Sequence, residues 1–327
     1  MFRTEIEISK TDLNLAHTDH VLTIGSCFAE VIGGKLKQNK INALVNPFGT
    51  IFNPESVCRL LRAAVNNDFD FEQNLLQRNG IWYAYDLHSS LSSPDKTQLL
   101  GQIEDRLKET REFLQNASLL IITLGTSLAY QLKETGNVVA NCHKLPANNF
   151  NRVLLDLQHI RTYFKETLAL IKSINPGLKV LLTVSPVRHV KETLTLNSVS
   201  KSELRLLCHY LQQDQQDVLY FPAYEIMMDD LRDYRYYKDD MLHPTTLAEN
   251  YIWDKFVNAY YDEAFQKFVP EWDKMLRAIT HKPFHPASEA HQAFLRNTLT
   301  QLQHLGDKYK IDVTEEQHAL EQQILTH

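Results

Sequence analysis

The sequence predicts a three-layer α/β/α sandwich built on a mainly parallel sheet. Short apolar runs, typical of strands that are buried on both faces, alternate along the chain with longer segments of helical period. Three of these runs end at small turn residues, as strands do where a loop leads into a helix: Gly25-Ser26, Gly125-Thr126 and Ser185-Pro186. Alternation of this kind favours helices on both faces of one sheet.

The expected elements follow in chain order. Strands are expected at 21–24, 42–45, 119–124, 180–184 and 218–221, and helices at about 28–39, 54–66, 97–116, 155–174 and 198–214. Two further segments indicate hairpins: an alternating aromatic run at 80–86, and residues 128–139 with a turn near Gly136. A strongly amphipathic helix is expected from Thr245 to about residue 265.

The character of the chain changes after about residue 265. The remaining sequence is polar, rich in Gln, Glu and His, and helical in period. We therefore expect an α/β domain over residues 1–265 and a helical C-terminal extension over residues 266–327. The extension is expected to pack against the α/β body or against a second subunit, which would make the protein a homo-oligomer.

Composition and charge exclude several classes of function. The chain has 327 residues, is 43% hydrophobic and carries a net charge of -6, so nucleic acid is not an expected partner. No apolar run approaches the ~20 residues of a membrane span, and the acidic N-terminus lacks the pattern of a signal peptide. We therefore expect a cytoplasmic protein with four reduced cysteines. Without metal-ligand spacing or a nucleotide-binding motif, neither a metal nor an organic cofactor is expected.

Ser26 is the first candidate for chemistry. The Gly25-Ser26 turn before a helix places a hydroxyl at the carboxyl edge of the sheet, beside the unpaired N–H groups of the helix N-terminus. If a histidine and a carboxylate lie close, Ser26 is the nucleophile of a serine hydrolase; otherwise it is a helix N-cap. Cys27 is an alternative nucleophile, although a residue just inside a helix that follows a strand usually packs toward the sheet.

Asp240 and His243 form the second candidate group. They lie three residues apart on a loop before the helix expected at Thr245. This spacing lets the carboxylate accept the Nδ1–H of the imidazole, which leaves Nε2 as a base. The alternative is a loop histidine beside a surface aspartate. Together with Ser26 at a strand end, the pair favours a catalytic triad.

Further sequence blocks extend the comparison beyond these residues. They span about residues 20–250 and include Gly25-Ser26-Cys27-Phe28-Ala29, Asn46-Pro47-Phe48-Gly49-Thr50, Asn141-Cys142-His143-Lys144 and Ser185-Pro186-Val187-Arg188-His189. In these blocks the sequence resembles the GSCFA family, which is placed beside the GDSL/SGNH hydrolases. The resemblance implies an SGNH/flavodoxin-like fold and a serine esterase that acts on a small O-acyl ester, of a carbohydrate or a cell-envelope precursor.

The resemblance also implies an oxyanion hole. By the SGNH pattern, the N–H groups of Ser26 and Gly49 would bind the oxyanion. A Gly-Thr-Ser sequence stands where the pattern has Gly-x-Asn. The hydroxyl of Thr126 or Ser127, or the amide of Asn141, would donate in place of that asparagine.

Three more residues are candidate ligands for the substrate, namely His143, Arg188 and His189. Each also has a structural interpretation: hydrogen-bonded histidines, and an arginine paired with Glu225 or Asp233. The predicted partner is a small-molecule acyl ester. Two other functions stay open: a non-catalytic ligand-binding protein that retains the cleft, and an O-acyltransferase that uses the same triad.

Overall fold

The computed structural model describes residues 4–9, 11–66, 69–191 and 193–325. Its strands are β1 (His20–Gly25), β2 (Asn42–Val45), β3 (Leu75–Arg78), β4 (Ile81–Ala84), β5 (Leu119–Leu124), β6 (Leu128–Leu132), β7 (Val138–Val139), β8 (Phe150–Leu154), β9 (Lys179–Val184) and β10 (Val218–Tyr220). Its longer helices are α1 (Cys27–Gln38), α2 (Pro54–Asn66), α3 (Lys96–Asn116), α4 (Leu157–Ile174), α5 (Leu194–Asp214), α7 (Thr246–Tyr260), α8 (Glu263–Ile279), α9 (Glu289–Tyr309) and α10 (Thr314–Glu321). Short helical turns are η1 (Phe71–Asn74), η2 (Ala147–Asn149), α6 (Ala223–Glu225), η3 (Ile226–Asp230) and η4 (Tyr234–Tyr236). Within the described ranges, no helix combines the length and apolarity needed to cross a bilayer.

Five parallel strands form the central sheet in the order β10-β9-β5-β1-β2. Numbered among themselves along the chain, these strands have the doubly wound order 2-1-3-4-5. β1 pairs with β2 on one side and with β5 on the other, and the winding reverses between β1 and β5. Ligands of such sheets bind at the carboxyl ends of the strands that flank this reversal. The predicted fold class is confirmed.

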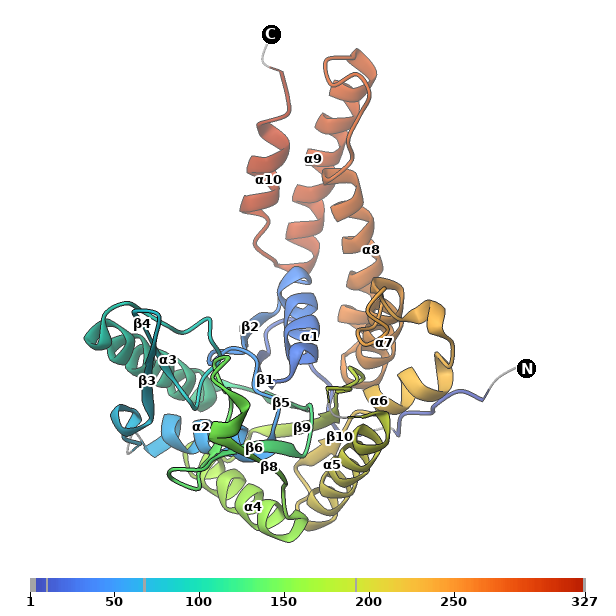
Figure 1. The fold of residues 1–327 in the computed structure, drawn as a ribbon. Helices are drawn as coiled ribbons and strands as arrows, with labels where there is room; N and C mark the ends of the chain where they lie inside the picture. Colours follow the sequence, from blue (N-terminus) through green and yellow to red (C-terminus); the bar gives the residue numbers. More distant parts are fainter. Residues whose placement is uncertain (1–3, 10, 67–68, 192, 326–327) are drawn as a thin grey trace.

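Helices cover both faces of the sheet (Figure 1). Successive strand residues point to opposite faces. Leu22 and Ile24 of β1 therefore pack in a core cluster with α2, α3, α4 and α5. Val21 of β1 and Ile121 of β5 pack on the other face, with α1, α7 and α8. Because both faces of the sheet are apolar, the sequences of its strands are continuous apolar runs rather than alternating patterns.

The predicted elements differ from the structure in four places. The aromatic run at 80–86 supplies only the second strand of its hairpin, β4, which pairs with β3 before it. α5 begins at Leu194 rather than at about 198, because the Thr193 side chain caps it. The helix expected from Thr245 to about 265 is two helices, since α7 ends at Tyr260 and the Asp262 side chain accepts the N–H of Phe265 to start α8. β8 was not expected from the sequence. It pairs with β6 in a three-stranded antiparallel sheet, β7-β6-β8.

The three C-terminal helices project from the α/β body (Figure 1). α8 is attached to it through the buried Trp272, whose indole N–H donates to the Gln38 carbonyl at the end of α1, at 2.7 Å. Lys40 lies over the Trp272 ring and pairs with Glu316 of α10, at 2.7 Å. The extension therefore packs on the α/β body. The predicted division after residue 265 falls inside α8, and its role in an oligomer stays a prediction.

Candidate active site

Ser26 lies where β1 turns into α1, at the carboxyl edge of the sheet. Gly25 before it has φ +133°, and a Cβ there would lie 2.1 Å from the Thr123 carbonyl oxygen, so only glycine lets β1 approach β5 this closely. The Ser26 Oγ accepts the N–H of Phe28 at 3.3 Å and caps α1. It also shares a hydrogen bond with Thr123 Oγ1, at 2.9 Å. Ser26 is fully buried in this conformation.

Asp240 and His243 form the pair that the sequence predicts. His243 Nδ1 lies 2.6 Å from Asp240 Oδ2, and Asp240 Oδ1 accepts the N–H groups of His243 and Leu242 at 3.0 and 2.8 Å. These bonds lower the pKa of Asp240 to about 2, and the bond from the His243 backbone contributes most. An ionised carboxylate only accepts hydrogen bonds, so the pairing assigns the proton to Nδ1 and leaves His243 Nε2 as an acceptor.

The loop after β9 links this pair to the sheet edge. The Arg188 N–H donates to the carbonyl of Leu242, directly before His243, at 3.3 Å. The next residue, His189, has its pKa lowered to about 3 by burial, then by the charges of Lys201 and His243. The Arg188–Leu242 bond thus holds the backbone before His243 against the loop that follows β9. Among the described residues no hydrogen bond joins His243 to Ser26, whose hydroxyl faces Thr123.

The backbone donors predicted for the oxyanion hole already have acceptors. The Ser26 N–H donates to the carbonyl and to Oγ1 of Thr123, both at 2.9 Å. The Gly49 N–H donates to the carbonyl of Asn46, at 2.8 Å. Gly49 has φ +72°, and a Cβ there would lie 2.4 Å from the Cβ of His88, so the turn requires glycine.

The predicted side-chain donors follow β5 and the small sheet. The hydroxyls of Thr126 and Ser127 bond to Ser200, at 2.9 and 3.3 Å. The Asn141 amide donates to Ser89 Oγ at 3.3 Å, and Thr126 and Asn141 both line the same cavity. Which group would hold an oxyanion stays a prediction.

The first turns of α5 hold two of the loops at the sheet edge. Asn197 Oδ1 accepts the N–H of His189 after β9, at 2.9 Å. Ser200 Oγ accepts the N–H of Ser127 after β5, at 2.8 Å, in addition to its bond with Thr126. One helix face therefore positions residues from both strand ends.

Lys201 continues this face and was missed by the sequence analysis. Its side chain is buried, and Nζ donates to the carbonyls of Gly125 and Ser185 at 2.8 and 2.7 Å. Burial lowers the pKa of Lys201 to about 7, which the nearby Cys27 only partly opposes. The sequence did contain a signal, because residues 197, 200, 201, 204, 207, 208 and 211 form one continuous helical stripe, and a lysine in such a stripe is a core position.

The other predicted substrate ligands have different surroundings. His143 is buried with both ring nitrogens bonded, Nε2 to the Ala84 carbonyl at 2.8 Å and Nδ1 to Ser89 Oγ at 3.0 Å. This matches its structural interpretation. The Arg188 guanidinium lies 4.1 Å from the centre of the Tyr237 ring, an aromatic contact rather than the ion pair considered from the sequence.

The four cysteines are expected to be unreactive. Burial raises the pKa of Cys27 and raises that of Cys142 to about 11, and Cys58 and Cys208 are fully buried. Because the thiolate is the reactive form, Cys27 in the folded protein should react with iodoacetamide at pH 7.5 at least about tenfold more slowly than in the urea-unfolded chain. Peptide mass spectrometry measures both rates. Faster alkylation of Cys27 in the folded protein would make it the better nucleophile candidate.

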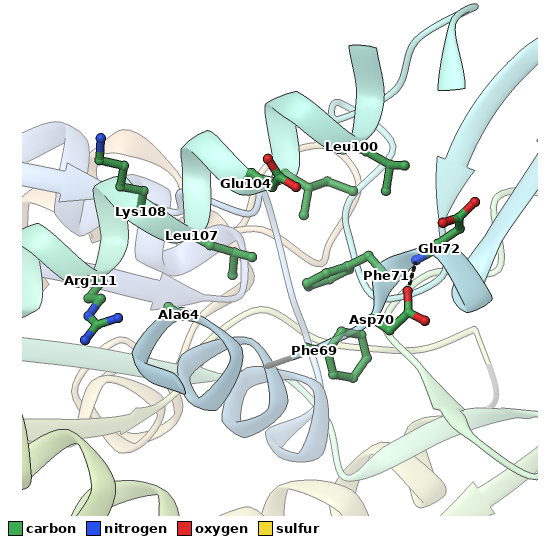
Figure 2. Close-up of a pocket in the computed structure, with 11 residues that line it drawn as sticks. Ala64, Phe69, Asp70, Phe71, Glu72, Leu100, Glu104, Leu107, Lys108 and Arg111 are labelled. Atoms are coloured by element: carbon green, nitrogen blue, oxygen red, sulfur yellow. Dashed lines mark hydrogen bonds between the residues drawn. The ribbon is translucent and has the colours of Figure 1, made fainter. Parts of the chain in front are cut away.

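Of two cavities in the structure, one is lined by predicted site residues and the other is not. One, of about 640 Å³, opens beside the strand ends and is lined by Thr126, Asn141 and His189 among others. Figure 2 shows another, of about 460 Å³, where Phe69 and Phe71 lie opposite Leu100 and Leu107 of α3. None of the predicted site residues belongs to the described lining of this second cavity. Among the described residues no cluster of His, Cys, Asp or Glu could hold a metal ion.

Two family models match the chain. A family model described as GSCFA family matches residues 20–256, and one described as GSCFA domain protein, C-terminal domain, matches residues 272–326. No curated protein matches the sequence. Among solved structures, a Clostridium thermocellum family 3 carbohydrate esterase is similar, with 13% identity and a TM-score of 0.31 over 74% of this chain and 94% of that chain. A likeness of this degree carries no argument about function.

Proposed function

The chain belongs to the GSCFA family, and we propose that it is a serine esterase of the SGNH type with Ser26, His243 and Asp240 as its triad. The observation that carries the proposal is the Asp240–His243 pair, at 2.6 Å, tied by the loop after β9 to the edge where Ser26 lies. A carboxylate that fixes one ring nitrogen leaves the other to act as a general base. The proposed substrate is a small O-acyl ester, of a carbohydrate or a cell-envelope precursor.

In the proposed reaction, His243 Nε2 takes the proton of the Ser26 hydroxyl while Oγ bonds to the ester carbonyl carbon. The C–O bond to the alcohol then breaks, and His243 returns the proton to the leaving oxygen. A water molecule, deprotonated by His243, cleaves the acyl-serine to give the carboxylic acid and free Ser26. Asp240 stays ionised throughout and stabilises the imidazolium.

The first step requires a change of conformation at Ser26. Its hydroxyl faces Thr123 and is buried, so it must turn about χ1, away from Thr123, before it can attack. Thr126 and Asn141 are the proposed oxyanion donors, because both border the cavity from which a substrate would approach.

The proposal is tested by a fluorophosphonate probe, which forms a covalent bond only with an activated serine. We expect the folded full-length chain to be labelled and peptide mapping to place the label on Ser26. Protein unfolded in urea is the control and should not react. Absence of labelling, or a label that maps elsewhere, would refute the assignment.

One observation favours a second function, a ligand-binding protein that retains the cleft. The Ser26 hydroxyl and the Gly49 N–H are both engaged within the protein, as expected of groups with purely structural roles. Such a protein would bind a ligand without reacting with the probe. An O-acyltransferase with the same triad would react with the probe but pass the acyl group to a sugar hydroxyl rather than to water.

A further inference from the structure

The cavity of about 640 Å³ lies between the strand ends and the small β7-β6-β8 sheet. It shares Thr126, Asn141 and His189 with the candidate active site. Its remaining walls come from β6, β8, the segment around residues 139–147, Phe52 and Asn53 before α2, and Lys191. A ligand in this cavity would therefore contact Thr126 and Asn141, the proposed oxyanion donors. Ser26, Asp240 and His243 do not belong to its described lining.

The charged residues in the described lining of this cavity are all basic. Lys144, Arg152 and Lys191 line it, and no Asp or Glu belongs to its described lining. Arg152 and Lys191 lie over the ring of Tyr130, 5.4 and 5.2 Å from its centre, and Arg152 donates to the Tyr130 hydroxyl at 2.9 Å. The whole chain is acidic, with a net charge of -6, so this concentration of positive charge does not follow from the composition.

The rest of the lining is suited to an organic ligand rather than to a bare ion. Phe52, Leu128, Leu145 and Phe150 supply apolar and aromatic surface. His189 Nε2 is buried without a hydrogen-bond partner among the described residues, although the residue lines the cavity. Burial lowers the pKa of His189 to about 3, which keeps the ring neutral. Apolar walls with a few convergent polar groups are typical of small-molecule sites.

We propose that this cavity binds the alcohol portion of the substrate, and that this portion is a carbohydrate bearing a carboxylate or a phosphate. The apolar walls would contact the sugar ring, and Lys144 and Lys191 would attract the charged group. The assignment of the bound molecule as the alcohol of an ester rests on the proposed esterase function. The preference for an organic anion rests on the lining, whereas the carbohydrate is taken from the proposed substrate.

Isothermal titration of the full-length Ser26→Ala variant tests this preference without any turnover. The probes are glucose, glucuronic acid, glucose 6-phosphate and inorganic phosphate. We expect one or both sugar anions to bind at least about tenfold more tightly than glucose and than inorganic phosphate, with an affinity that falls as NaCl is added. The two anions distinguish a carboxylate from a phosphate. Equal affinity for glucose, tightest binding by inorganic phosphate, or no binding by either sugar anion would overturn the proposal.

Matched variants locate the binding. Lys144→Gln and Lys191→Gln each remove one exposed charge from the cavity, and each is expected to weaken binding of the sugar anion roughly three- to fivefold. Lys133→Gln removes an exposed charge from the same small sheet, outside the cavity lining, and should leave the affinity unchanged. Equal losses of affinity in all three variants would mean that the net charge of the protein, and not this cavity, determines binding, and would contradict the assigned site. Anion binding that persists in a chain unreactive toward fluorophosphonate would refute the esterase and leave the cavity assignment intact.

Discussion

The Ser26→Ala variant is expected to hydrolyse a short-chain aryl ester roughly 10⁴-fold more slowly than the wild type, or not measurably. Loss of the nucleophile of a triad leaves only the part of the rate that binding and oxyanion stabilisation supply. Release of nitrophenol measures the rate, with the protein concentration checked by absorbance. Unchanged turnover would show that Ser26 is only the cap of α1.

The structural role of Ser26 needs its own control, because the hydroxyl caps α1 and bonds to Thr123. Loss of a serine cap costs about 1 kcal/mol of stability, which leaves the chain folded but lowers its melting temperature. Thr123→Val removes the same hydroxyl–hydroxyl bond from the other side and keeps the nucleophile. We expect this variant to lose comparable stability and to retain hydrolysis within about tenfold.

The combined effect of two substitutions on the rate provides a second check of the proposed triad. If Ser26 and His243 act as one unit, His243→Ala should be as inactive as Ser26→Ala, and the double variant should be no slower than either. Losses that multiply in the double variant would mean that the two residues act separately.

At pH 9, the free energy of unfolding of the Lys201→Met variant is expected to be about 2–5 kcal/mol lower than that of the wild type. Lys201 Nζ donates to the carbonyls of Gly125 and Ser185, and methionine leaves both buried oxygens without this partner. A buried acceptor that loses its partner costs about 1–3 kcal/mol. Urea unfolding followed by circular dichroism gives the difference, with Lys133→Met as the surface control.

This difference should depend on pH in a defined direction. Burial lowers the pKa of Lys201 to about 7, whereas an unfolded lysine titrates near its ordinary value of 10.5. Between these values the unfolded chain binds a proton that the folded protein does not, so the wild type gains stability as pH rises, by at most about 1.4 kcal/mol per unit. Methionine does not titrate. The stability lost in Lys201→Met should therefore be larger at pH 9 than at pH 6, and equal losses at both would contradict a titrating Lys201.

Local signals explain what the sequence could predict. Ser26 was found because a glycine and a serine directly follow an apolar strand, and Asp240 and His243 because three residues of loop suffice to close their hydrogen bond. The parallel sheet was predictable because its strands are apolar on both faces. Each of these features depends on residues that are close in the sequence.

Other features depend on contacts between distant segments. β8 alternates poorly, since Asn151 and Arg152 are both exposed, and it becomes a strand only through its pairing with β6. The direction of the Ser26 hydroxyl is set by Thr123, 97 residues away. For Lys201, the sequence shows its place in the buried helical stripe of α5 but not the carbonyls that it binds.

The polar face of α5 has a consequence for how the sheet edge can open. Asn197 holds the loop after β9, Ser200 holds the loop after β5, and Lys201 binds a carbonyl from each. Neither loop can leave its position without losing bonds to a helix that the other loop also needs. Displacement of the start of α5 would release both loops together, and exchange through this motion should give the amide hydrogens of Ser127 and His189 matched rates of exchange with solvent deuterium.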